Sequence, residues 1–188
     1  MLTRAISMLR ILLLALSFSP AWADEYSDAI GVFKNAGESG KFFDTAYGYA
    51  VFPSIGKAGF VLGGAYGTGH VYQKGKVIGD SSMTQVSVGL QLGGQAYSEI
   101  IFFEDERALK EFTGGNFEFD ADASVVAITA AASAQASTTG SSAGASGGKH
   151  DATTVGKYRR GMATFTVAKG GLMYEAAIAG QKFSYKAR

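Results

Sequence analysis

The chain has 188 residues, a formal charge of +1, 47% hydrophobic residues and no cysteine. This composition excludes a disordered chain, which needs low hydrophobicity and high net charge, and it excludes disulfide scaffolds and thiolate metal sites. The near balance of charge also argues against nucleic-acid binding, which usually depends on a basic surface.

The first residues have the organisation of a secretory signal peptide. Arg4 and Arg10 form a basic start, residues 11–16 are an apolar run, and residues 21–23 match an A-x-A cleavage pattern. The apolar run is shorter than the roughly 20 residues that span a bilayer. We therefore expect residues 1–23 to be removed and the protein to be exported, to the periplasm or to an outer-membrane or surface-associated location. An uncleaved N-terminal anchor is the alternative.

Residues 24–35 predict a short helix. Tyr26, Ile30 and Phe33 recur at spacings of four and three, which places them on one helix face. Residues 41–45 predict a further helical turn. An apolar stripe of this kind either packs on the core or contacts a membrane interface, and we expect the second.

Strand patterns start at Tyr47. Residues 47–52 predict a strand that ends at Pro53, and residues 54–57 predict a turn. Between residues 59 and 69 small residues occupy almost every second position, opposite a parity that carries Leu62 and Tyr66. Glycines along one strand face indicate close backbone approach or tight curvature, which is typical of a curled sheet or barrel.

The remaining elements follow in order. Residues 73–76 predict a hairpin turn, and the alternation over 86–92 predicts a half-buried strand with Val86 on its apolar face. Residues 100–103 predict a strand, 104–112 a short charged helix closed by Gly114 and Gly115, and 117–128 a further strand. Residues 133–149 are rich in Ser, Gly and Ala and predict a flexible loop. The last strands are expected within 153–158, 162–168 and 172–185.

These elements together predict one α+β domain over residues 24–188. Its core is a mostly antiparallel, curled β-sheet, barrel-like or sandwich-like, with one helix at the N-terminus and one short helix in mid-chain.

No sequence motif supports catalysis. The G-x-S-x-G match at residues 144–148 lies inside the predicted loop, without the strand and helix that a nucleophile elbow needs. His70 and His150 are 80 residues apart, and neither has a second histidine near it in the sequence. We therefore expect no enzyme activity, no cofactor and no metal.

Three basic residues in predicted turns and two that precede the penultimate predicted strand form the candidate binding site. They are Lys57, Lys74, Lys76, Arg159 and Arg160, and Tyr158 adds an aromatic ring. Lysine and arginine near a membrane attract anionic headgroups, at about 1 kcal/mol each. The alternative is ordinary solubilising charge on turns, and the sequence does not decide between them.

Several segments resemble the SYLF family. Residues 47–60, YGYAVFPSIGKAGF, are similar to its opening signature, and a glycine-rich segment follows at 61–69. Residues 86–95 and 100–112 resemble two later blocks, so the resemblance covers roughly residues 30–185.

The resemblance implies a lipid-binding module, with anionic phospholipid or a membrane surface as its partner. It also implies a relation to actin regulators, but an exported chain would not meet actin, and we do not expect actin as a partner. The alternative is an envelope structural or protein-interaction module without a lipid ligand.

Overall fold

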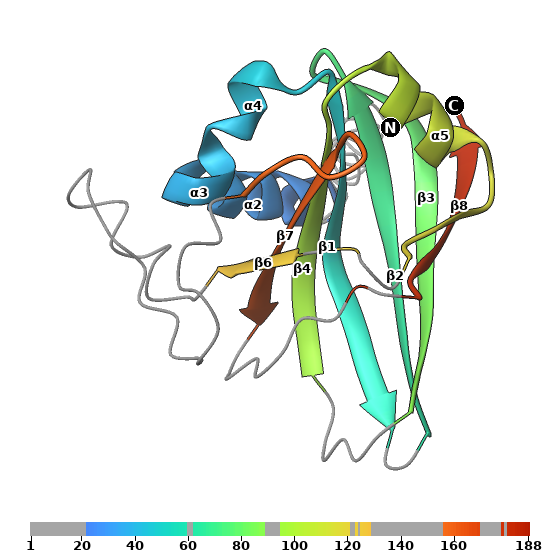
Figure 1. The fold of residues 1–188 in the computed structure, drawn as a ribbon. Coiled ribbons are helices and arrows are strands. Elements are labelled where there is room, and N and C mark those ends of the chain that lie inside the picture. The colour runs from blue at the N-terminus through green and yellow to red at the C-terminus, as the bar shows by residue number, and fades with distance from the viewer. Residues whose placement is uncertain are drawn as a thin grey trace, which may run out of the picture.

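A computed structural model describes residues 22–59, 62–88, 95–120, 123, 125–128, 156–169, 178 and 180–188. They form an α+β structure in which short helices flank one curled sheet, a half-barrel (Figure 1). This confirms the fold class predicted from the sequence. Residues 1–21 of the predicted signal peptide and the whole predicted loop 133–149 lie outside the described residues.

Four helices are described: α2 (Trp22–Asn35), α3 (Gly37–Gly40), α4 (Phe42–Thr45) and α5 (Glu106–Thr113). The first and last confirm the predicted helices. Asp105 is the N-cap of α5, and its carboxylate accepts a hydrogen bond from the backbone N–H of Ala108 at 2.8 Å. None of the described helices has the length and apolar character needed to cross a membrane.

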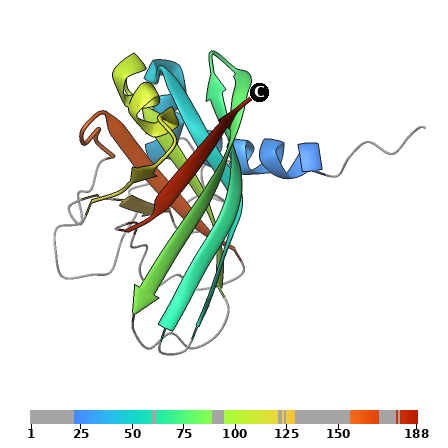
Figure 2. The ribbon, with the colours of Figure 1, turned by 90° about the vertical axis from the view of Figure 1, so that its right-hand side faces the viewer.

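The sheet contains eight described strands in the order β5-β8-β3-β2-β1-β4-β7-β6. Neighbours are antiparallel except β6 and β7, which run parallel. The strands are β1 (Gly48–Gly59), β2 (Leu62–Gln73), β3 (Lys76–Val88), β4 (Gln95–Phe103), β5 (Phe117–Glu118), β6 (Val125–Ile128), β7 (Met162–Lys169) and β8 (Lys182–Ala187). The long strands curl together, as Figure 2 shows, and leave β5 and β6 at the two ends of the strand order.

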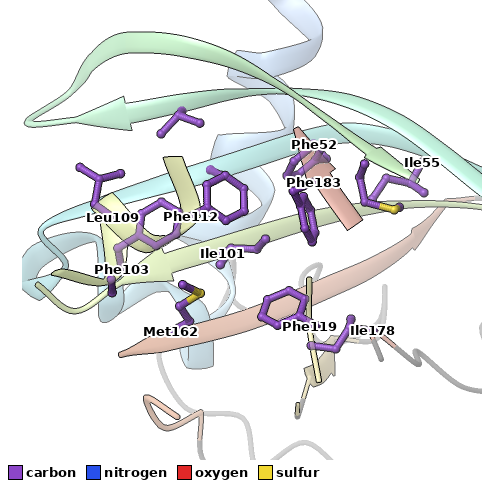
Figure 3. Close-up of a cluster of buried hydrophobic side chains, with 14 of the residues drawn as sticks. Phe52, Ile55, Ile101, Phe103, Leu109, Phe112, Phe119, Met162, Ile178 and Phe183 are labelled. Carbon is purple, nitrogen blue, oxygen red and sulfur yellow. The ribbon is translucent and has the colours of Figure 1, made fainter. Parts of the chain in front are cut away.

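From Tyr97 to Phe103, strand β4 is buried on both faces. Ile101 and Phe103 of β4 belong to a core on the concave side, which is the inner face of the curled sheet. Side chains from α5, β7 and β8 also enter this core (Figure 3). Ile100 and Phe102 join a second core beneath the N-terminal helices. A strand covered on both sides has a continuous apolar sequence, which explains the run Ile-Ile-Phe-Phe.

The predicted end of the first strand at Pro53 is wrong, and so is the predicted turn at 54–57. β1 continues to Gly59, and its pairing shifts register between Val51 and Ser54 on one side and between Phe52 and Ile55 on the other. Pro53 lies at this irregularity, where its missing N–H interrupts no regular ladder. The strand therefore passes through the proline.

Two later strand predictions also change. Val86 is 81% exposed and its neighbour Gln85 is buried, because Met83 sets the core-facing parity of β3. The single strand predicted over 117–128 is two strands at opposite ends of the sheet, since β5 pairs with β8 and β6 pairs with β7. Residues 156–158 form no strand, and 153–155 lie outside the described residues. Of the strand predicted over 172–185, residues 172–177 and 179 also lie outside them, and the described strand β8 begins at Lys182.

Over residues 63–69 of β2, the residues that face the core are all small. Tyr66 is 58% exposed, whereas Gly67 and Gly69 are buried. A Cβ at Gly69 would lie 2.6 Å from Cδ1 of Phe52, and a Cβ at Gly67 would lie 2.6 Å from Cγ1 of Ile55. The glycines therefore provide the room for two large β1 side chains, as the predicted close approach requires.

Gly69→Ala should lower the free energy of unfolding by about 1–3 kcal/mol, because the added methyl group overlaps the Phe52 ring. Gly56→Ala in β1 is the matched control, since nothing lies within 4 Å of its added Cβ. Chemical denaturation measures both variants. Equal stability of the two would contradict the role assigned to Gly69.

Candidate functional site

Two tight turns carry basic residues. Lys74 (φ 50°) and Gly75 (φ 76°) join β2 to β3. Arg160 (φ 51°) and Gly161 (φ 82°) form a second turn, in which the backbone N–H of Arg159 donates to Met162 O at 2.8 Å and that of Met162 donates back at 3.0 Å. Each of the two turns has two successive residues with positive φ, which is the geometry of a type I′ hairpin turn. The Lys-Gly and Arg-Gly pairs are their sequence signals.

Both turns lie at one end of the sheet, here named the turn end. Gly48 of β1 is opposite Gln73 of β2 and opposite Phe103 of β4, and Phe103 is opposite Met162 of β7. Three strand spacings separate the two turns, which is about 14 Å. The ladder thus brings Lys74 and Lys76 to the same end as Arg159 and Arg160, as Figure 1 shows for the elements.

Lys57 does not join this group. It is opposite Ala65 on β2 and Gln95 on β4, at the far end of β1. Nine residues separate it from Gly48, and a strand rises about 3.3 Å per residue, so roughly 30 Å lie between Lys57 and the turn end. The fold therefore brings four of the five basic residues to one end of the sheet and leaves Lys57 at the other.

The three residues around the second turn point to different surroundings. Tyr158 is half-buried and its ring meets Phe42 edge-on at 5.1 Å, so it serves the core under the helices. Arg160 forms an ion pair with Asp120. Arg159 is exposed and makes no ion pair within the described part of the chain.

The apolar stripe of α2 packs on the protein. Phe33 is fully buried, and Ile30 packs against the same core under the helices. Tyr26 stacks on His70 with a centroid distance of 3.8 Å and an interplanar angle of 5°. The predicted membrane-contact role of this stripe is therefore corrected: in this structure the sheet covers it.

His70 holds α2 to the outer face of β2. Its Nε2 lies 3.3 Å from Asp80 Oδ1 and 2.9 Å from a guanidinium nitrogen of Arg188. Burial lowers the pKa of His70, and the Arg188 cation lowers it further. Over the described ranges, no three side chains of His, Asp or Glu gather closely enough to hold a metal ion.

A buried polar cluster that no sequence pattern predicted lies on the concave side. The Gln181 amide Nε2 donates to Glu99 Oε2 at 3.0 Å and to Tyr97 Oη at 3.2 Å. Glu99 is opposite Thr166 across β4 and β7. Glu99 Oε1, Gln181 Oε1 and Thr166 Oγ1 are buried without a hydrogen bond from any described residue. One acidic residue before the apolar run 100–103 is the only sequence signal for this cluster.

Burial raises the pKa of Glu99 to about 8, and the hydrogen bond from Gln181 opposes part of that shift. At neutral pH the carboxyl group is therefore mostly protonated, which avoids an unpaired buried charge. A protonated carboxyl group also has an O–H to donate.

Comparison with known proteins gives two findings. A family model described as "Ysc84: Las17-binding protein actin regulator" matches residues 84–187. The chain is also 30% identical over 156 residues to Beta cell expansion factor A of Aeromonas veronii. The aligned segment covers 82% of this chain and 51% of that protein. The chain thus spans about half the length of this curated relative.

Glu99→Gln should change how stability depends on pH. Unfolded glutamate titrates near pH 4.3 and folded Glu99 near 8, so the folded protein holds one more proton between these values. The free energy of unfolding should therefore fall as the pH rises from 5 to 8, by roughly 1.4 kcal/mol per pH unit at most. Glu99→Gln removes this contribution, so its stability relative to wild type should rise over the same range.

Urea denaturation at several pH values between 5 and 8 measures this difference. A stability difference between the two proteins that stays constant with pH would contradict the protonated state of Glu99.

Proposed function

The chain belongs to the SYLF family, whose Ysc84 model covers more than half of it, and from this premise we propose that it is a non-enzymatic lipid-binding protein of the bacterial envelope. The proposed ligand is the anionic headgroup of a phospholipid. The proposed contacts are Lys74, Lys76 and Arg159 at the turn end of the sheet.

The charge at the turn end supports this proposal. All three side chains are exposed, and none forms an ion pair within the described residues. The two hairpin turns present them at one end of the sheet, so they can meet a flat anionic surface together. Glu104 also lies at this end, where its backbone N–H donates to Gly161 O at 2.8 Å, and it reduces the local positive charge.

The proposed location comes from the sequence. The basic start, apolar run and A-x-A pattern within residues 1–23 support export, and an exported lipid-binding protein meets the membranes of the envelope. The family description names an actin regulator. Export would separate this chain from cytoskeletal filaments, so the proposal assigns phospholipid and not actin as its partner.

A second candidate function is an envelope protein-interaction module. Val86 is 81% exposed and Tyr66 is 58% exposed, and both lie on the outer face of the sheet on neighbouring strands. Exposed large apolar side chains that lie close together are found at protein interaction sites. This candidate places the functional surface on β2 and β3 and needs no lipid.

Charge reversal at the turn end tests the lipid proposal. Lys74→Glu, Lys76→Glu and Arg159→Glu together should reduce co-sedimentation with vesicles of phosphatidylglycerol and phosphatidylcholine at least roughly tenfold at low salt, because each cation contributes about 1 kcal/mol. High salt should weaken wild-type binding, since salt screens exposed charges.

Lys57→Glu is the matched control, because it reverses the same kind of charge at the far end of β1. It should leave vesicle binding close to that of wild type. Equal losses in the two variants would show a general charge effect and no defined site. Absence of wild-type binding to anionic vesicles would reject the lipid proposal and favour the protein-interaction module.

A further inference from the structure

The half-barrel has a seam where its sheet does not close. Residues 117–120, in and after β5, and residues 159–164, at the start of β7, come from opposite parts of the strand order. They line one pocket together. Among the described residues no backbone hydrogen bond joins the two segments, and the ion pair between Asp120 and Arg160 crosses the seam.

The seam pocket has an apolar wall and a charged rim. Its apolar residues are Phe117, Phe119, Ala123 and Met162. Phe119 and Met162 are 8% and 6% exposed, and Figure 3 shows them on the same side of the core. The rim carries Glu111, Glu118, Asp120, Arg159 and Arg160.

The rim favours an anion despite its three carboxylates. Glu111 pairs with Arg107 at 3.1 Å, Glu118 pairs with Lys182 at 3.5 Å, and Asp120 pairs with Arg160. Each acid therefore has its own cation. Arg159 has no such partner within the described residues, so its guanidinium is the group at the rim that an anion would neutralise.

The pocket also has a polar limit at its base. Thr164 lines it and is 4% exposed. The next residue on the same face of β7 is Thr166, about 7 Å further along, which is opposite Glu99. Thr166 Oγ1 and Glu99 Oε1 are buried without a hydrogen bond from any described residue. A hydrocarbon chain that reached Thr166 would place methylene groups against these two oxygens and could not supply a hydrogen bond to either. The pocket therefore suits only the first methylene groups of a hydrocarbon chain, those nearest to the polar head group of the ligand.

We propose that the seam pocket binds one single-chain anionic amphiphile of the fatty-acid class. Its carboxylate pairs with Arg159, and its first methylene groups pack against Phe117, Phe119 and Met162. This inference rests on the proposed lipid-binding function and adds to it a ligand class and a pocket, which shares Arg159 with the exposed turns.

Decanoate is the probe, at concentrations below those at which it forms micelles. Calorimetric titration of the delipidated chain should show saturable binding of one decanoate per chain. Decanol, which lacks the charge, should bind several-fold more weakly. Arg159→Glu should weaken decanoate binding roughly tenfold, because it replaces the pairing cation by a like charge.

Ala123→Phe tests the apolar wall, because the larger side chain fills the pocket, and it should also weaken decanoate binding roughly tenfold. If the Ala123→Phe variant does not fold, Arg159→Glu still tests the proposal, because Arg159 is exposed and its substitution should leave the fold intact. Lys57→Glu, remote from the pocket, should bind decanoate like wild type. Absence of saturable decanoate binding, or equal binding by both pocket variants and wild type, would overturn the proposal.

Two further measurements separate this inference from the proposed function. The Ala123→Phe variant should still co-sediment with anionic vesicles. The double variant Lys74→Glu, Lys76→Glu should lose vesicle binding and keep decanoate binding. Vesicle binding without decanoate binding would overturn the seam site alone. Decanoate binding without vesicle binding would overturn the headgroup proposal and support an enclosed amphiphile site.

Discussion

The burial of β4 on both faces is the constraint on which the rest of the structure depends. Ile100 through Phe103 are all fully buried, and alternate side chains enter two different cores. A slip of one residue would exchange the two sets. Because both sets are apolar, hydrophobicity alone does not fix the register, and the shapes of the side chains and the polar Glu99 must do so. Glu99 has its Gln181 partner only on the concave side.

The positions of the two basic turns follow from this register. β1 pairs with β2 on one side and with β4 on the other, and β4 pairs with β7. Once Gly48 lies opposite both Gln73 and Phe103, the hairpin at Lys74 and the turn at Arg160 must lie at the same end of the sheet. A surface for headgroups can therefore arise from residues more than 80 positions apart in the chain.

The same curl leaves an interior that is not uniformly apolar. The concave side packs aromatic rings near α5, but Glu99, Thr166 and Gln181 lie further along it with polar atoms that no described residue satisfies. Such groups cost stability, so they are expected where a fold serves more than its own packing. None of the three lines the seam pocket, which reaches Thr164 on β7, two residues before Thr166.

The sequence by itself determined the local elements and the family. The helix at 104–112 and the hairpin at 73–76 follow from side-chain chemistry within a few residues of each other, and the alternating small residues over 59–69 indicate close backbone approach or curvature without naming the partner strand. Only the tertiary structure decided which faces are covered. Periodicity shows that Phe33 lies on an apolar helix face, but it does not say whether a sheet or a membrane covers that face. It also placed Val86 on the wrong side and ended β1 at Pro53, and it did not say that Lys57 lies far from the other basic residues. In each case the outcome depends on strands distant in the chain, whose pairing sets burial, position and register, and no local pattern contains that information.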